Sequence, residues 1–377
     1  MMKCFEQQRV SAAHVMVVGC GALGNEVLKN LVLLGVGHIV VVDFDVVEMG
    51  NLSRSILFLP SDAENKRLKV DVVAERLKAI NPAVEVKTIC GDVAYDVGLG
   101  LIRQQDVVIG CVDNRWARYC INRLCMRADV PWVDGGIEEL EGTARVFVPG
   151  ENCYACSLGP EGLKDLARRM PCSGIIRRHE QAGSVPTTSV VASVIGAVQV
   201  QEAVKLLHQE ALGRGDLTSL CGKMFYYDGQ HLTTKVVEFK AYDDDCAEHD
   251  RWNPIRPSAI TRDMPVSETI EWLCRELASQ SVCISLENDC FVDYVSERSN
   301  DQRTSVMCPG RAVEEAVERD EHLKGILFSG LYQHEYRMID HTFPYPELTL
   351  RQLGIPASEV LHVMADGQDY YLEIDVK

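Results

Sequence analysis

The chain has 377 residues, of which 46% are hydrophobic and 25% are charged, and it carries a formal net charge of −17. This length allows two domains with sizeable cores, and the composition is that of a globular protein. The acidic balance argues against nucleic acid as the main partner, because binding phosphates needs a basic surface, but it permits a basic protein partner.

The fifteen cysteines do not indicate a disulfide framework in a chain of this length. The N-terminus, MMKCFEQQRV, lacks the apolar core of a signal peptide. We therefore expect a reducing, cytoplasmic setting in which some thiols serve metal binding or catalysis. The longest apolar run, 188–207, contains Gln199, Glu202 and Lys205. These polar side chains favour a buried or interface helix over a membrane span, so we expect no membrane contact.

The N-terminal part of the chain alternates strands and helices. Residues 14–18 predict a buried strand, a glycine-rich turn follows at 19–24, and then come a helix over 25–35 and a parallel strand over 38–43. A helix is predicted over 64–80, ending at an Asn-Pro stop. Three more strands are predicted at 84–89, 106–111 and 145–148. This order predicts an α/β fold with a mainly parallel, Rossmann-like sheet.

Further along, the regular periodicity fades between 150 and 186, where cysteine, arginine and glycine accumulate. A long helix over 188–208 and a strand near 223–228 follow. The polar, proline-ended segment 243–254 then predicts a boundary between a domain over 1–255 and a small α+β domain over 256–377.

The small C-terminal domain has its own predicted elements. A helix is expected over 267–279 with Ser267 as its N-cap. Residues 282–286 and 291–295 predict strands, and Asp366-Gly367 between two strand-like runs predicts a hairpin.

Three glycines in the first turn fit a phosphate-binding pattern. Gly19, Gly21 and Gly24 match G-x-G-x-x-G, which lets backbone amides at a helix N-terminus approach phosphates. Asp43, at the end of the second strand, is placed to bind ribose hydroxyls. By itself the motif is typical of nicotinamide or flavin enzymes, and a tight turn with close helix packing is the structural alternative.

The residues after Asp43 extend this pattern with a further set, namely Asp45, Asn51, Arg54, Lys69, Ile80-Asn81-Pro82 and Asp113-Asn114. From about residue 14 to 250, the chain resembles the adenylating family of ubiquitin-activating enzymes and the bacterial sulfur-carrier activators MoeB and ThiF. The resemblance implies adenylation of a partner protein's C-terminus, with ATP and Mg²⁺ as cofactors.

The chemistry of adenylation agrees with these residue types. A carboxylate attacks the α-phosphate of ATP and expels pyrophosphate, so two anions must meet and cations are needed at the phosphates. Arg54 and Lys69 can supply positive charge, and Asn51 can hydrogen-bond between them. Asp113 follows a predicted strand, where its carboxylate can hold the Mg²⁺ that bridges phosphates.

Two departures from the family pattern concern partners. Ser55 stands where the family usually has glutamine after the arginine. The R-Y-x-R-Q element, which in the family lies upstream of the first strand and reaches the partner subunit's ATP, is absent. We therefore expect a homodimer or heterodimer in which a partner subunit supplies this arginine, or a chain that manages without it.

Two spaced pairs, Cys153-x-x-Cys156 and Cys246-x-x-His249, predict a tetrahedral structural Zn²⁺ site with four protein ligands. MoeB-like and eukaryotic relatives carry two C-x-x-C pairs at these places, so His249 is a substitution that zinc accepts. The alternative is that the two pairs are unrelated.

Cys172 aligns with the catalytic cysteine of ThiF and of small-modifier activating enzymes, in a segment over 157–187. Nearby cations lower a thiol's pKa, and four arginines flank this one, namely Arg168, Arg169, Arg177 and Arg178. A thiolate can attack the acyl carbon of an adenylate, and an inert thiol is the alternative. Four other cysteines fall on core-like elements, namely Cys20, Cys111, Cys120 and Cys125.

Residues 256–377 resemble, more weakly, the ubiquitin-fold domain with which eukaryotic activating enzymes recruit a conjugating enzyme. The whole chain thus resembles an activator of a ubiquitin-like protein ending in glycine, as in bacterial ubiquitin-like conjugation operons, some of which serve antiphage defence. One alternative is a sulfur-carrier adenylyltransferase of the MoeB or ThiF type. Another is a non-catalytic partner subunit.

Overall fold

The chain divides into two compact units in this computed structural model. The structure describes residues 5–169, 187–239, 246–286, 292–296, 305–307 and 331–375. The N-terminal unit comprises Met1–Ala94, Leu101–Glu161 and Gln181–Arg251. The C-terminal unit comprises Tyr95–Gly100, Gly162–Glu180 and Trp252–Lys377.

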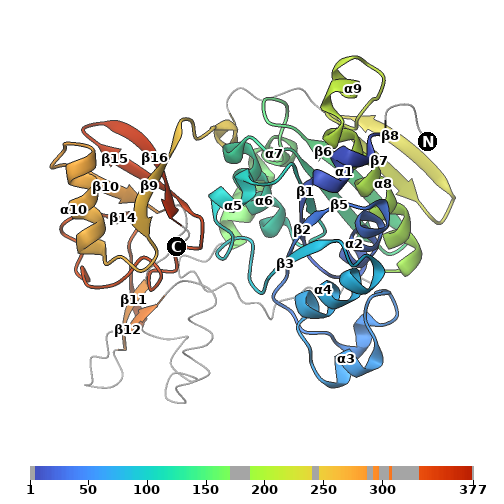
Figure 1. The fold of residues 1–377 in the computed structure, drawn as a ribbon, viewed down its shortest axis with the longest axis horizontal. Coiled ribbons are helices and arrows are strands. Elements are labelled where there is room, and N and C mark those ends of the chain that lie inside the picture. The colour runs from blue at the N-terminus through green and yellow to red at the C-terminus, as the bar shows by residue number, and fades with distance from the viewer. Residues whose placement is uncertain are drawn as a thin grey trace. The chain divides into compact units, whose positions relative to one another are not determined.

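The N-terminal unit is built on one eight-stranded sheet with the order β3-β2-β1-β4-β5-β6-β7-β8 (Figure 1). The first five strands are parallel and the last three are antiparallel. The strands are β1 His14–Val18, β2 His38–Val42, β3 Glu85–Ile89, β4 Val107–Gly110, β5 Trp132–Glu138, β6 Glu141–Phe147, β7 Lys223–Asp228 and β8 Thr233–Glu238. This order confirms the predicted mainly parallel α/β fold. The order of the strands along the sheet reverses between β1 and β4, and parallel sheets of this kind bind ligands at the point of such a reversal.

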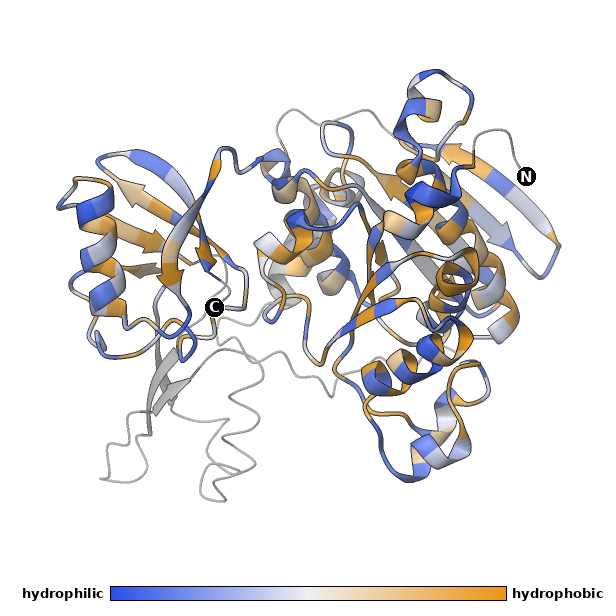
Figure 2. Ribbon diagram, in the orientation of Figure 1, coloured by the Kyte–Doolittle hydropathy of each residue, from blue (hydrophilic) through white to orange (hydrophobic). Residues whose placement is uncertain are grey.

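Helices cover both faces of this sheet. Helices α2, α4 and α8 lie over one face, and α6 contacts β4 and β5 from the other. The helices and 3-10 turns are α1 Gln7–Ala12, α2 Ala22–Leu34, η1 Met49–Asn51, α3 Pro60–Glu64, α4 Lys69–Ile80, α5 Leu99–Arg103, α6 Arg115–Ala128, α7 Tyr154–Arg169, α8 Ser189–Leu207, α9 Gln209–Gly213 and η2 Ala247–His249. Because both faces are covered, β1, β2 and β4 are almost entirely buried. Their residues are almost continuously hydrophobic, as the hydropathy colouring of Figure 2 shows.

Helix α8 packs in the core of the N-terminal unit, against α2, β4, β5 and β6. It is the one helix in the described part of the chain that is long and apolar enough to cross a membrane. Its buried Gln199 donates a hydrogen bond from Nε2 to the carbonyl oxygen of Gly110, 2.9 Å away. Because the buried amide of Gln199 hydrogen-bonds to the backbone at the end of β4, α8 is a core helix of this unit.

Two predicted boundaries differ from the structure. The segment after 150, expected to be irregular, contains the helix α7 with a kink at Gly159, where φ is +64°. A Gly-Pro pair at this kink interrupts the helical pattern in the sequence. The helix expected over 64–80 begins only at Lys69, after the short helix α3.

The C-terminal unit is an α+β structure with a five-stranded sheet in the order β14-β10-β15-β16-β9 and a three-stranded sheet in the order β12-β11-β13. Helix α10, Val266–Glu276, packs against the core of the larger sheet. The strands are β9 Ile255–Thr261, β10 Val282–Ser285, β11 Val292–Ser296, β12 Ser305–Met307, β13 Leu331–Glu335, β14 Met338–Ile339, β15 Val360–Ala365 and β16 Gln368–Asp375. The predicted hairpin is present as β15 and β16, joined by Asp366 and Gly367, both with positive φ.

The predicted N-cap of α10 is wrong by two residues. Pro265 is the N-cap, and Ser267 lies inside the first turn. The backbone N–H groups of Val266 and Ser267 donate to the carbonyl oxygens of Leu348 and Pro346. This distant segment satisfies the first amides of the helix, so the serine hydroxyl is not needed as a cap.

Candidate functional site

The glycine turn joins β1 to α2 and needs glycine at two of its three positions. Gly19 has a φ of +97°, and a Cβ there would lie 2.5 Å from the carbonyl oxygen of Cys111. A Cβ on Gly24 would lie 2.0 Å from the carbonyl oxygen of Gly19. Gly21, the N-cap of α2, has no atom within 4 Å of its Cβ position, and no described side chain caps this helix end. The backbone at Gly21 is therefore open to a ligand.

Asp43 ties the end of β2 to this turn. Its Oδ2 accepts a hydrogen bond from the N–H of Cys20 at 2.6 Å, and its Oδ1 accepts one from the N–H of Asp45 at 2.8 Å. Burial raises the pKa of Asp43, against the opposing effect of the Lys69 ammonium and these backbone donors. The carboxylate thus lies beside the glycine turn, at the position where an acid binds ribose hydroxyls in folds of this type.

Lys69 lies behind the two acids rather than on the protein surface. Its Nζ is 2.7 Å from Oδ2 of Asp45, and its side chain is only 10% exposed. Burial would lower the pKa of Lys69, but the charges of Asp43 and Asp45 outweigh it, so that the pKa is raised. Lys69 is therefore a protonated, largely buried cation at the carboxyl edge of the sheet.

Asn51 and Arg54 lie in the loop after β2, in and after η1. Oδ1 of Asn51 accepts a hydrogen bond from the N–H of Glu48 at 2.9 Å. The Arg54 guanidinium donates to the carbonyl of Gly50 at 3.4 Å, and it forms no ion pair with any residue that the structure describes. Arg54 is thus a cation whose donors remain largely available for an anion.

A polar residue that the sequence analysis passed over holds this loop to the glycine turn. Asn25, fully buried in α2, donates from Nδ2 to the carbonyl oxygens of Cys20 and Gly21. Its Oδ1 accepts a hydrogen bond from the N–H of Leu57, 2.9 Å away. The signal in the sequence was an asparagine directly after the last glycine of the motif. It connects the segment bearing Arg54 to the turn.

Asp113 follows β4, whose end lies against the glycine turn through Cys111. Its carboxylate is exposed and has a weak contact, at 3.4 Å, with Nδ2 of Asn114. Asn114 is the N-cap of α6 and accepts a hydrogen bond from the N–H of Ala117 at 2.7 Å. The structure therefore places Asp113 at the same edge of the sheet as the glycine turn.

A buried ion cluster beside this loop had no signal in the sequence. Asp134, in β5, is 1% exposed and lies between the guanidinium groups of Arg118 and Arg145, at 2.9 Å and 2.6 Å. Burial would raise the pKa of Asp134, but the two cations outweigh it and hold the pKa below its usual value. Asp134 is therefore a buried, ionised carboxylate.

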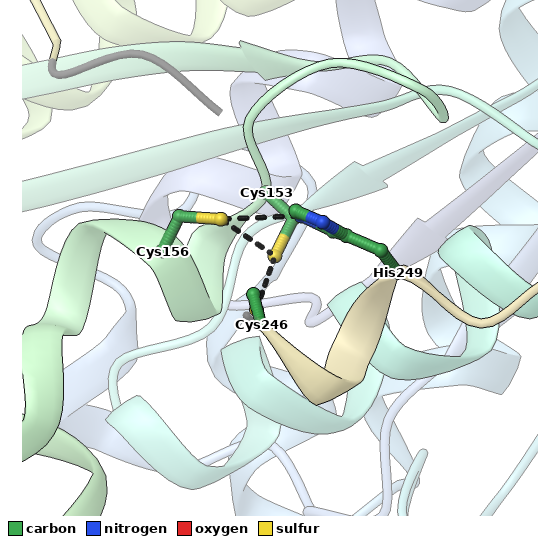
Figure 3. A group of neighbouring side chains, drawn as sticks. All are labelled: Cys153, Cys156, Cys246 and His249. Carbon is green, nitrogen blue, oxygen red and sulfur yellow. Dashed lines mark hydrogen bonds between the residues drawn. The ribbon is translucent and has the colours of Figure 1, made fainter. Parts of the chain in front are cut away.

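The four predicted metal ligands lie together. Figure 3 shows that Cys246 and His249 come from the two ends of η2, opposite Cys153 and Cys156 at the start of α7. Their ligand atoms all lie within 4.8 Å of one another. Cys153 Sγ is 3.7 Å from Cys156 Sγ and 3.8 Å from Cys246 Sγ.

These distances fit zinc. A zinc–sulfur bond of about 2.3 Å places two sulfurs of a tetrahedron about 3.8 Å apart. Three thiols and one imidazole are a donor set that Zn²⁺ binds, and four protein ligands leave no open position. The site therefore fits a structural zinc ion.

Five further cysteines have a predicted role, four of them structural and one catalytic. Burial raises the pKa of the four thiols predicted to be structural, namely Cys20, Cys111, Cys120 and Cys125. A raised pKa keeps a thiol protonated and unreactive. Cys172 lies outside the described residues, as do Arg177 and Arg178, whereas Arg168 and Arg169 end the helix α7.

Comparison with known proteins bears on the N-terminal unit. Residues 3–248 match the model of the ThiF family. The chain is 31% identical over 238 residues to the SAMP-activating enzyme E1 of Haloferax volcanii, covering 63% of this chain and 81% of that protein. It is 34% identical to the sulfur carrier protein adenylyltransferase of Thermus thermophilus, covering 59% of this chain and 77% of that protein.

Longer relatives are covered only in part. The mouse adenylyltransferase and sulfurtransferase MOCS3 is 32% identical, and the match covers 64% of this chain and 48% of that protein. Among solved structures, E. coli MccB with MccA aligns with a TM-score of 0.51 at 20% identity, covering 65% of this chain and 68% of that chain. This likeness supports the fold.

Proposed function

This chain belongs to the ThiF family, and from this premise we propose that it uses ATP to adenylate the C-terminal carboxylate of a small ubiquitin-like or sulfur-carrier protein. Relatives are named as a SAMP-activating E1 and as a sulfur carrier protein adenylyltransferase. The observation that carries the proposal is the meeting of Asp43, Asp45 and Lys69 beside the open N-terminus of α2.

Each residue has a part in this proposed reaction. The N-terminus of α2 binds phosphate through the open backbone at Gly21, and Asp43 binds the ribose. Lys69 and Arg54 supply positive charge where the carboxylate meets the α-phosphate and where pyrophosphate leaves. Asp113 would hold Mg²⁺, which neutralises phosphate charge when bound.

The adenylation proposal is tested by exchange of labelled pyrophosphate into ATP, with a small glycine-ending protein encoded near this gene as substrate. Wild-type protein should catalyse the exchange, and Asp113→Ala should abolish it because the metal loses a carboxylate ligand. Asp216→Ala, which removes an exposed aspartate paired with Arg214, serves as the control and should keep it. Unchanged exchange in Asp113→Ala would refute the site.

A second proposed step makes the chain an activating enzyme for conjugation. Here the Cys172 thiolate attacks the acyl carbon of the adenylate, AMP leaves, and a thioester forms. The domain over 256–377, which we propose is ubiquitin-like, then receives the conjugating enzyme. The resemblance of residues 157–187 and of residues 256–377 to parts of activating enzymes supports this step. As part of the same proposal, the chain acts in bacterial antiphage defence.

The sulfur-carrier function is the second candidate, and the names of the Thermus and mouse relatives favour it. In that case the adenylated carrier protein goes on to receive sulfur, and no thioester with this enzyme is needed. Cys172→Ala distinguishes the two. If wild type forms a reductant-sensitive adduct with the small protein, and Cys172→Ala loses this adduct but keeps pyrophosphate exchange, conjugation is supported. If wild type forms no such adduct, the sulfur-carrier function is supported. The scaffold-only alternative is disfavoured because such subunits tend to lose the ATP-site and cysteine residues, whereas this chain keeps Asp45, Asn51, Arg54, Lys69, Asp113 and Cys172.

A further inference from the structure

Asp134 is a buried carboxylate that the proposed chemistry does not use. It is 1% exposed, and both of its oxygens accept hydrogen bonds from guanidinium groups. Arg118 Nε donates to Oδ1 at 2.9 Å, while Arg145 Nη2 donates to Oδ2 at 2.6 Å. Such a cluster is costly to desolvate, so hydrophobic side chains would serve packing alone at least as well.

Arg118 connects this carboxylate to the loop that bears Asp113. Its Nη2 donates to the carbonyl oxygen of Val112 at 2.8 Å and to that of Gly135 at 3.1 Å. Val112 directly precedes Asp113, so the guanidinium holds the peptide unit from which the Asp113 backbone continues. The same guanidinium is oriented by Asp134 through Nε.

Asp113 has little else to fix its position. Its carboxylate is exposed, and its hydrogen-bond partner among the described residues is Nδ2 of Asn114 at 3.4 Å. Where this carboxylate points therefore depends on the backbone on either side of it. Asn114 fixes the far side as the N-cap of α6, and Arg118 fixes the near side.

We propose that Asp134 is a positioning residue for Asp113: by orienting Arg118, it fixes the Val112 carbonyl and so sets where the Asp113 carboxylate is presented to Mg²⁺·ATP. This inference rests on the proposed function, because it assumes that Asp113 binds the metal. Groups that orient metal ligands in this way typically change metal affinity about 10- to 100-fold when they are removed.

The test is the Mg²⁺ dependence of ATP binding, measured by calorimetry on the full chain without any partner protein. Asp134→Asn keeps the shape but removes the charge that orients Arg118. Arg118→Lys keeps the charge but loses the fork that reaches both Asp134 and Val112. Both variants should raise the Mg²⁺ concentration at half-saturation about tenfold, with ATP binding in the absence of Mg²⁺ unchanged.

Two controls separate positioning from stability. Glu202→Gln removes another buried carboxylate, paired with Lys205 in α8, and should lower the melting temperature without moving the Mg²⁺ dependence. Arg145→Lys keeps a cation beside Asp134 and does not touch Val112, so its shift should be smaller than that of Arg118→Lys.

The outcomes keep this inference distinct from the proposed function. Wild-type protein that binds ATP with no Mg²⁺ dependence contradicts the assignment of Asp113 as a metal ligand, whereas wild-type protein that catalyses no pyrophosphate exchange contradicts the proposed function itself. If ATP binding by wild type depends on Mg²⁺ but Asp134→Asn and Arg118→Lys have the wild-type Mg²⁺ concentration at half-saturation, the positioning role of Asp134 is overturned. The proposed function is then unaffected. Equal shifts in Glu202→Gln also overturn the positioning role, because general destabilisation then explains them. Equal shifts in Arg145→Lys and Arg118→Lys overturn it too, because disturbing the Asp134 cluster then suffices without the contact to Val112.

Discussion

Gly21 and Gly24 lie three residues apart in one turn but are constrained in opposite ways. Gly24 lies in α2, where alanine is ordinarily better than glycine by about 1 kcal/mol. Here its Cβ would lie 2.0 Å from a backbone oxygen, whereas the Cβ of residue 21 would lie in open space. Gly24 is required by packing, and Gly21 leaves room for a ligand.

We therefore expect Gly24→Ala to lower the free energy of unfolding by roughly 1–3 kcal/mol, because backbone must move to accept the methyl group. Gly21→Ala should leave stability within about 0.5 kcal/mol and weaken ATP binding, because the methyl group occupies the approach to the backbone. Thermal unfolding and ATP titration measure the two effects. Normal ATP affinity in Gly21→Ala would place the phosphates elsewhere.

Asp134 also predicts a pH dependence of stability. Burial raises its pKa, Arg118 and Arg145 lower it, and the net pKa lies below the usual 3.8. A carboxyl with a lowered pKa stabilises the folded state above its unfolded pKa, and this stability is lost as the pH falls through the folded value.

Between about pH 5 and acid unfolding, wild type should therefore lose free energy of unfolding more steeply than Asp134→Asn. Urea titrations at several pH values measure both slopes. Zinc release in acid affects both proteins, so the difference between them isolates the carboxylate. Equal slopes would show that Asp134 has the same pKa in the folded and unfolded states.

Short elements that cannot fold alone meet at the metal site. The 3-10 turn η2 is three residues long, and the kinked helix α7 begins one residue after Cys153. Tyr119 of α6 donates a hydrogen bond to Glu248, between the two ligands that η2 supplies. A turn this short has no core of its own, so we infer that bound metal fixes it to α7.

Protein purified without chelator should contain about one zinc ion per chain. Cys246→Ser should remove the metal and lower the melting temperature more than it lowers nucleotide affinity, because metal binding is coupled to folding. Cys221→Ser, which changes a cysteine of the same unit outside the cluster, should retain zinc. Metal-free wild type would contradict this site.

The two units divide the work in the proposed function. The ThiF match ends at residue 248, just before the C-terminal unit resumes at Trp252. Trp252 is buried, and its ring stacks on Tyr371 with centroids 4.8 Å apart. Trp252 thus packs with the C-terminal unit, four residues before the start of the 256–377 domain that we propose.

Truncation after Arg251 should keep pyrophosphate exchange, because the ATP-site residues and all four metal ligands remain. It should abolish transfer of the activated protein to a conjugating enzyme, because the proposed docking domain is lost. Exchange assays and transfer assays on the same preparations measure both steps. Transfer at the full-length rate would show that docking lies elsewhere.

Features that depend on residues close together along the chain could be predicted from the amino-acid sequence. The βαβ order follows from hydrophobic periodicity, the turn follows from the spacing of Gly19 and Gly24, and the metal pairs follow from C-x-x-C and C-x-x-H spacing. Periodicity failed at α7, where Gly159 breaks the pattern, and at the start of α10, where a distant segment caps the helix.

Which polar groups are buried together could not be predicted in this way, because it depends on the packing of distant segments. Nothing in the local sequence distinguishes Asp134 from an exposed aspartate, because its partners Arg118 and Arg145 come from a helix and a neighbouring strand. The link from Asn25 to Leu57 and the burial of Lys69 behind Asp45 arise in the same way. A side chain's propensity is fixed by its own chemistry, but its burial, pKa and partners are fixed by chain segments that packing brings together.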